Sequence, residues 1–111
     1  MFYDSMSGQY FRSSFEAVDS AITKISKRLI KEDVTYNELL YEFGANQTQM
    51  FNRLGWVMGD EPYIRKTNIT VNGEAVTTID ADPDQLIQAA QRSYWYSREY
   101  LSFLWSYKPC T

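Results

Sequence analysis

The sequence predicts a small α+β domain built from a helical hairpin, a two-stranded β-hairpin and a long, aromatic-rich C-terminal helix. Three observations favour this fold class. Two stretches with helical spacing begin with capping signals, an Asn-Gly pair lies between two runs rich in β-branched residues, and an Asp-Pro start introduces another helical stretch. The 111 residues are 44% hydrophobic and 16% aromatic, which suits one packed core. We expect a single domain over residues 1–106 and a loose tail over residues 107–111.

The first helix is expected to begin at Ser13, because Ser13 and Glu16 have the spacing of a capping box. Apolar residues then recur at intervals of three and four, which predicts a buried stripe about four turns long. This stripe comprises Phe15, Val18, Ile22, Ile25 and Leu29. Phe11 extends it backwards if the preceding turn is also helical.

The second helix lies within the stretch TYNELLYEFG, residues 35–44. Thr35 is the predicted cap, Glu38 completes a capping box, and Gly44 is the expected left-handed stop. A helix over residues 36–43 is too short to be stable alone in water. We therefore expect it to pack against the first helix and to close a helical hairpin.

Asn72-Gly73 is the strongest short-range signal for a β-hairpin, because a type I′ turn needs positive φ at both central residues. The predicted register pairs Val71 with Glu74, Ile69 with Val76, and Thr67 with Thr78. Ile69 and Val76 then share one face of the hairpin, which we expect to lie against the helices.

The third helix is expected to begin with Asp82 as cap and Pro83 at its first position, and to continue to about Ser106. Its aromatic residues are too numerous for one face. Ile87, Tyr94, Leu101 and Trp105 form one stripe, whereas Trp95, Tyr96, Tyr100 and Phe103 point elsewhere. Such residues can fill a core, anchor a protein interface or stack on bases. We predict that Trp95, Tyr96, Tyr100 and Phe103 are partner-binding residues.

The net charge of −3 and the pI of about 4.8 disfavour nucleic acid and anionic membranes as partners, because both carry negative charge. No apolar run is long enough to span a bilayer, and Cys110 alone cannot form an intramolecular disulfide. A reducing compartment suits this cysteine usage.

The chain contains few groups that support catalysis. It lacks histidine, so Cys110 has no imidazole to activate it. Asp80, Asp82 and Asp84 match the first ligand positions of a calcium loop, but Gln85 and Gln91 replace its glycine and its bidentate glutamate. A strand end followed by a helix cap explains these acids. We therefore predict no catalytic residue, no metal and no cofactor.

Several motifs resemble the C-terminal domain of an uncharacterised family encoded by tailed phages and bacterial mobile elements. The matching stretches are FYDSMSGQYFRSSFEAV, YNELLYEFG and LGW. They contain Tyr3, Asp4, Ser7, Tyr10, Phe11, Asn37, Tyr41, Phe43, Gly44, Leu54, Gly55 and Trp56. The resemblance implies an origin and a fold; because that family has no established activity, it implies no catalytic residue.

We expect a non-enzymatic, phage-type accessory protein that binds another protein or associates with itself. Its expected location is the cytoplasm of a bacterial host, or a virion. One alternative is a structural component of the virion. Another is a small enzyme using only carboxylates and tyrosines, which would need a crowded site of Asp, Glu and Tyr in a deep pocket.

Overall fold

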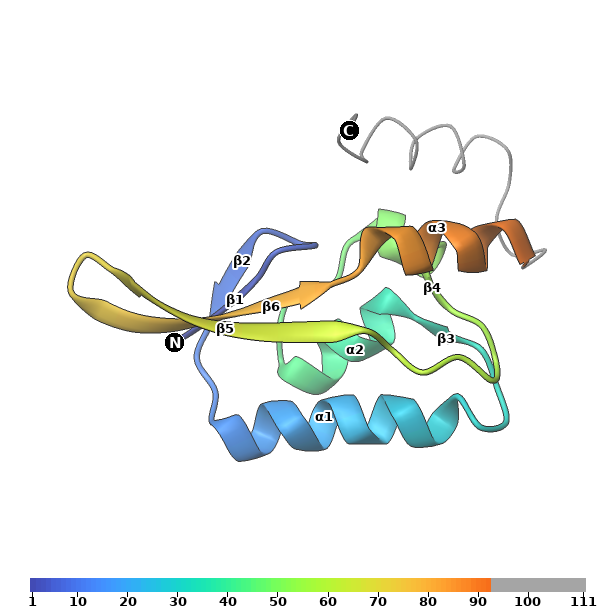
Figure 1. Ribbon diagram of the computed structural model, residues 1–111, viewed down its shortest axis with the longest axis horizontal. Coiled ribbons are helices and arrows are strands. Elements are labelled where there is room, and N and C mark those ends of the chain that lie inside the picture. Colours follow the sequence, from blue (N-terminus) through green and yellow to red (C-terminus); the bar gives the residue numbers. More distant parts are fainter. Residues whose placement is uncertain (93–111) are drawn as a thin grey trace.

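The computed structural model describes residues 1–92, which form a small α+β domain as predicted. The helices are α1 (Phe15–Arg28), α2 (Tyr36–Phe43) and α3 (Pro83–Arg92), together with the short 3-10 helix η1 (Gln49–Asn52). The strands are β1 (Phe2–Asp4), β2 (Gln9–Phe11), β3 (Val34–Thr35), β4 (Gly55–Trp56), β5 (Ile64–Val71) and β6 (Glu74–Ala81). Helices α1 and α2 lie on one side of the main sheet (Figure 1).

The main sheet is mixed and has the strand order β2-β1-β6-β5. β1 runs parallel to β6, with Phe2 opposite Thr77, and the other neighbouring strands are antiparallel. The sequence patterns do not predict β1 and β2, and the turn before α1 is not helical, so the condition for extending the first helical stripe to Phe11 is not met. Phe11 instead ends β2 opposite Phe2. Each of these two strands is three residues long, and β1, which pairs with β2, also pairs with β6 far along the chain, which no local pattern reveals.

Helix α1 begins one residue later than predicted. The Ser14 side chain, and not that of Ser13, caps the helix by accepting a hydrogen bond from the Ala17 amide at 3.1 Å. The expected stripe is buried at Val18, Ile25 and Leu29, but Phe15 is 56% exposed. Phe15 lies in the first turn, where its ring touches only the edge of the core through the Phe2 ring, at a centroid distance of 5.3 Å.

The predicted boundaries of α2 are confirmed. The Thr35 amide donates to Glu38 Oε2 at 2.7 Å in a capping box, and Gly44 has a left-handed φ of 76°. Glu38 also forms an ion pair with Arg28 at the end of α1. The capping group therefore fastens the short helix to α1, which is the packing that the sequence requires of it.

The β5–β6 hairpin has the predicted turn and register. Asn72 and Gly73 have φ values of 50° and 79°, and Ile69 pairs with Val76. However, Ile69 is 43% exposed, so the expectation that this pair lies against the helices is wrong for Ile69. The reason is visible in Figure 1, where the tip of the hairpin extends well beyond both helices.

Strands β3 and β4 form a small second sheet that depends on a close backbone contact. A Cβ atom on Gly55 would collide with the Val34 carbonyl oxygen. The neighbouring Trp56 side chain is fully buried, and its Nε1 donates to Gln85 Oε1 of α3 at 3.0 Å. Trp56 thus links the second sheet to α3.

Helix α3 begins as predicted. Asp82 Oδ1 accepts a hydrogen bond from the Asp84 amide at 2.9 Å, and Pro83 occupies the first helical position. Leu86, Ile87, Ala89 and Ala90 are buried. The expected continuation to Ser106 and the tail over residues 107–111 lie outside the described residues.

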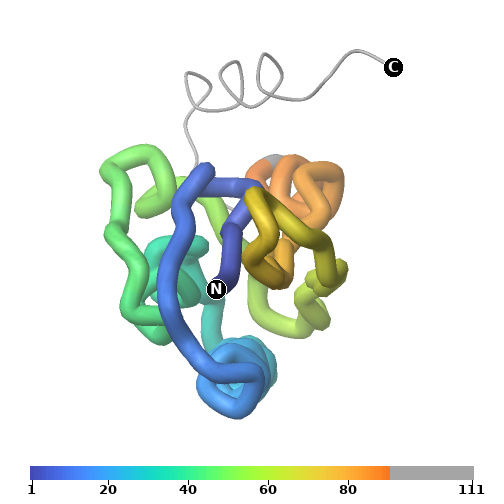
Figure 2. The backbone as a smooth tube through the Cα atoms, turned by 90° about the vertical axis from the view of Figure 1, so that its left-hand side faces the viewer, coloured from blue at the N-terminus to red at the C-terminus, as the bar shows by residue number. Residues whose placement is uncertain are grey.

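The two edges of the main sheet differ. The segment of residues 44–56 lies on the opposite side of the N-terminal strands from the β5–β6 hairpin (Figure 2). Gln9 on β2 exchanges two hydrogen bonds with the Asn46 backbone, at 2.7 and 2.9 Å. The β2 edge is therefore covered by this segment, while β5 forms the other edge.

Candidate functional site

Most residues of the motifs in FYDSMSGQYFRSSFEAV, YNELLYEFG and LGW help to build the packed region around β1, α2 and β4. We call this region the frame. Asn37 is buried, donates to the Thr48 carbonyl oxygen at 2.5 Å and accepts from the Thr48 amide at 3.0 Å. Gly55 and Trp56 hold the second sheet, as described above. These positions stabilise the fold and are inaccessible to a ligand.

Asp4 is the most unusual carboxylate of the frame. The Tyr36 hydroxyl donates to its Oδ1 at 2.5 Å, and the Ser7 amide and hydroxyl donate to its Oδ2 at 2.9 and 2.6 Å. Burial raises the pKa of Asp4, although the hydrogen bonds from Ser7 and Tyr36 act in the opposite direction. The carboxylate thereby joins the β1–β2 turn to the start of α2.

This pair of Asp4 and Tyr36 is relevant to the alternative of a carboxylate–tyrosine enzyme. Both side chains have 0% exposure and line none of the hollows described below. A substrate has no access to them in this conformation. Their geometry is that of a structural bridge.

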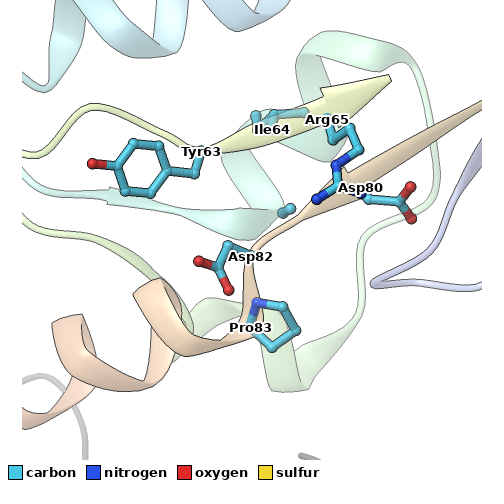
Figure 3. A pocket seen from close by; sticks show the side chains of 7 residues that line it. Tyr63, Ile64, Arg65, Asp80, Asp82 and Pro83 are labelled. Atoms are coloured by element: carbon cyan, nitrogen blue, oxygen red, sulfur yellow. The ribbon is translucent and has the colours of Figure 1, made fainter. Parts of the chain in front are cut away.

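The accessible surface is hollowed around the segment of residues 57–63. One hollow of about 670 Å³ is lined by Tyr63, Ile64, Arg65, Asp80, Ala81, Asp82 and Pro83 (Figure 3). A second, of about 570 Å³, is lined by Gly59, Asp60, Glu61, Tyr63, Asp82, Asp84, Gln85 and Gln88. A third, of about 300 Å³, is lined by Ser26, Leu29, Ile30, Gly59, Asp60 and Glu61. Because neighbouring hollows share lining residues, we treat them as one feature, the Tyr63 groove.

Backbone hydrogen bonds hold the segment that forms this groove. The Met58 amide donates to Asp33 Oδ1 at 2.7 Å, and the Gly59 amide donates to the Leu29 carbonyl oxygen at 2.8 Å. Further along, the Tyr63 carbonyl oxygen accepts from the Asp82 amide at 3.1 Å. The segment is therefore attached to the end of α1 and to the start of α3.

Gln85 is central to this attachment. Its Oε1 accepts from both the Tyr63 amide, at 2.9 Å, and Trp56 Nε1, while its Nε2 donates to the Glu61 carbonyl oxygen at 2.7 Å. One side chain thus links the groove to the buried Trp56. The position of the groove is set by the frame.

Large apolar side chains nevertheless face water at this end of the molecule. Tyr63 and Ile30, which line the groove, are 66% and 78% exposed, and Met58, next in sequence to the lining residue Gly59, is 57% exposed. In Figure 3 the Tyr63 ring points away from Arg65 and lies on the same side as the Asp82 carboxylate. Ordered backbone with exposed apolar side chains is the arrangement of a preformed contact surface.

The lining of the groove is strongly acidic. It contains the carboxylates of Asp60, Glu61, Asp80, Asp82 and Asp84, and Arg65 is the one cation among its described lining residues. The described residues contain no group of three acidic or cysteine side chains that could hold a metal ion. Asp80 lies near the end of β6 and Asp82 caps α3, in agreement with the sequence interpretation of these acids.

Comparison with known proteins places the described domain in a family. The model of a family of unknown function, DUF6353, matches residues 1–97. The chain belongs to this family. No curated protein and no solved structure matches it. The match includes the whole Tyr63 groove, so this surface lies within the DUF6353 domain.

The partner-binding residues predicted from the sequence, Trp95, Tyr96, Tyr100 and Phe103, lie outside the described residues. The DUF6353 match reaches Trp95 and Tyr96 and ends before Tyr100. Their role in partner binding therefore stays a prediction.

Sequence reasoning missed Tyr63, Met58 and Glu61. A local signal existed, because the stretch GDEPY combines a turn-forming glycine and proline with two acids and a tyrosine. Exposed aromatic residues in such loops are candidates for recognition. Among residues 1–92, no helix has the length and apolar character that crossing a bilayer requires.

Proposed function

We propose that this DUF6353 protein is a non-enzymatic accessory module that works by binding another protein or a second copy of itself. The observation that carries the proposal is the Tyr63 groove. Its backbone is fixed by hydrogen bonds to Leu29, Asp33 and Gln85, yet it leaves Met58 and Tyr63 largely exposed.

Interface physics supports this proposal. Tyrosine and methionine are enriched at protein interfaces, and tyrosine is a frequent energetic hot spot. Because the groove is already ordered, binding loses little conformational entropy on this side of the contact. The same properties would be unfavourable for a surface that only faces water.

The chemistry of the described residues favours binding over catalysis. The carboxylate–tyrosine pair with the most perturbed environment, Asp4 with Tyr36, is enclosed in the frame. The groove carboxylates lack a neighbouring histidine, because the chain has none, and residues 1–92 contain no cysteine.

A phage-type role in a bacterial host cell or a virion is the finer part of the proposal. Its support is the motif resemblance at residues 3–11, 37–44 and 54–56. The aromatic residues Trp95, Tyr96, Tyr100 and Phe103 are proposed as a second contact region of the same module, since they exceed what one helix face can bury.

The test combines light scattering on the full chain with affinity capture and cross-linking from a bacterial lysate. We expect self-association or a captured protein that is weakened by Tyr63→Ala, or by Trp95→Ala combined with Tyr100→Ala, without unfolding. A wild-type chain that stays monomeric at high concentration and captures nothing would contradict the proposal. Unfolding of the Trp95/Tyr100 variant would assign those two side chains to the core.

A further inference from the structure

We infer that the Tyr63 groove binds a positively charged, amphipathic protein segment. Its apolar side chains would pack on Tyr63 and Met58, and its lysine or arginine residues would face Glu61, Asp80 and Asp82. The inference rests on the proposed function and specifies the partner of the same site. It commits to a different protein and not to a second copy of this chain.

The shape of the groove suits a segment several residues long. Its hollows of about 670 and 570 Å³ meet at Tyr63 and Asp82, and the third continues past Gly59 towards Ile30. Each of the larger two falls in the volume range of small-molecule sites, about 300–1,000 Å³. A chain laid along them would contact the end of α1, the segment 57–63 and the β6–α3 junction in succession.

The acidic lining of the groove favours a partner with positive charge. Five carboxylates and one guanidinium line the groove, whereas the whole chain carries a net charge of only −3. Carboxylates in a hollow repel phosphate backbones and anionic lipids and attract cations. A lysine or arginine can also lie over the exposed Tyr63 ring in a cation–π contact.

The apolar side chains exclude a bare cation as the whole ligand. A metal ion would leave Tyr63 and Met58 in water, and the described residues contain no three-ligand cluster to coordinate it. A partner that covers these side chains must itself be apolar there. An amphipathic cationic segment satisfies both requirements.

A second copy of this chain has the wrong overall charge for an acidic groove, because its net charge is −3. Lys24, Arg28 and Lys66 form ion pairs within their own chain, with Glu42, with Glu32 and Glu38, and with Asp19. Presenting these cations to a neighbouring groove would require breaking the internal pairs. The favoured occupant is therefore another protein.

The probe is a synthetic peptide of lysine and leucine with the leucines at helical spacing, titrated into the isotope-labelled full chain. Chemical-shift changes are followed by NMR and affinity by fluorescence. We expect the largest shifts at residues 57–65 and 80–85. A peptide with glutamate in place of lysine, and one with glycine in place of leucine, should bind much more weakly because each lacks one of the two required contacts.

Two matched pairs of variants separate the groove from the general charge of the protein. Glu61→Gln and Glu74→Gln remove the same charge, but Glu74 lies at the hairpin turn, at the far end of the long axis (Figure 1). Tyr63→Ala and Tyr41→Ala remove the same ring, and Tyr41 is 70% exposed on α2 and lines none of the three hollows. We expect about tenfold weaker binding for Tyr63→Ala and about threefold for Glu61→Gln at low salt. Neither control should change the affinity.

Equal effects within either matched pair, shifts centred away from the groove, or affinity independent of salt would overturn the inference. If the peptide fails in this way while the protein still self-associates or captures another partner, only the cationic-partner inference fails. If no partner of any kind is found, the proposed function fails with it. A circular dichroism melt of each variant establishes that the fold is retained.

Discussion

Two regions of the molecule differ in how their side chains are used. These regions are the frame, around β1, α2 and β4, and the Tyr63 groove. In the frame, Asp4 and Asn37 are buried and bonded to Ser7, Tyr36 and Thr48. In the groove, the backbone is hydrogen-bonded but the side chains of Glu61, Tyr63 and the adjoining Met58 face solvent. The buried polar groups of the frame are thus committed to internal contacts, while Tyr63 and Glu61 in the groove present their side chains to solvent.

This difference indicates that the exposed groove is a better candidate for function than the buried motif residues. The motif residues that make the sequence recognisable stabilise buried contacts, as Asn37, Gly55 and Trp56 do. A recognisable sequence pattern can therefore report a fold and leave the functional surface unmarked. Exposure, shape and charge distinguish the groove from the rest of the surface.

The largest expected effect is at Gly55 in the frame. Gly55→Ala should lower the free energy of unfolding by about 3 kcal/mol, because the new Cβ would collide with the Val34 backbone. Gly44→Ala is the matched control, with positive φ but no atom within 4 Å of its Cβ, and should cost about 1 kcal/mol. Urea melts that ranked the two variants the other way would show that the β3–β4 contact is not close.

Asp4→Asn has the next largest expected effect. It should lower the free energy of unfolding by about 2 kcal/mol near neutral pH, because an amide cannot accept all three hydrogen bonds from Ser7 and Tyr36. The effect should also depend on pH. Since the pKa of Asp4 is raised in the folded protein, the folded state binds this proton more tightly than the unfolded chain does. The Asp4 contribution to stability is then fully present below about pH 4 and decreases as pH rises through the folded pKa.

Urea melts of wild type and Asp4→Asn over a pH series measure this contribution as the difference between the two unfolding free energies. That difference should be largest in acid. Thr70→Ala, on the exposed part of β5, removes no ionisable group and is the control variant, which should show no such trend. A difference that grew with rising pH would mean that the hydrogen bonds outweigh burial at Asp4.

Thr35→Ala should lower the free energy of unfolding by about 1 kcal/mol, which is the usual loss when a capping hydroxyl is removed. Thr23→Ala, on the exposed side of α1, removes the same atoms without a cap and should be neutral or slightly stabilising. Similar losses from both variants in thermal melts would mean that the capping box contributes nothing to α2.

The smallest effect on stability is expected in the groove. Tyr63→Ala should change the unfolding free energy by no more than about 0.5 kcal/mol, because its ring is largely in water. Tyr36→Phe removes a single oxygen atom from the frame and should cost about 1 kcal/mol through the bond to Asp4. If the loss of the Tyr63 ring proved the more damaging, the groove would belong to the frame and the contrast between the two regions would disappear.

Local chemistry accounts for the elements that could be predicted. Thr35 with Glu38, Gly44, Asn72-Gly73, and Asp82 with Pro83 each define a boundary through contacts among neighbouring residues. Ser14 shows the limit of this reasoning, since two adjacent serines offer the same hydroxyl and only the backbone conformation selects one as the cap.

By itself, the sequence determined the α+β class, the second helix, the hairpin with its register and the start of α3. Only the tertiary structure decided that β1 and β2 join β6 in one sheet, that Gly55 sits against Val34, and that Ile69 lies on a projecting tip. It also assembled the Tyr63 groove from the end of α1, the segment 57–63 and the β6–α3 junction. The physical reason is that turns and caps depend on energies between near neighbours, whereas sheet order and surface hollows depend on which distant segments pack together.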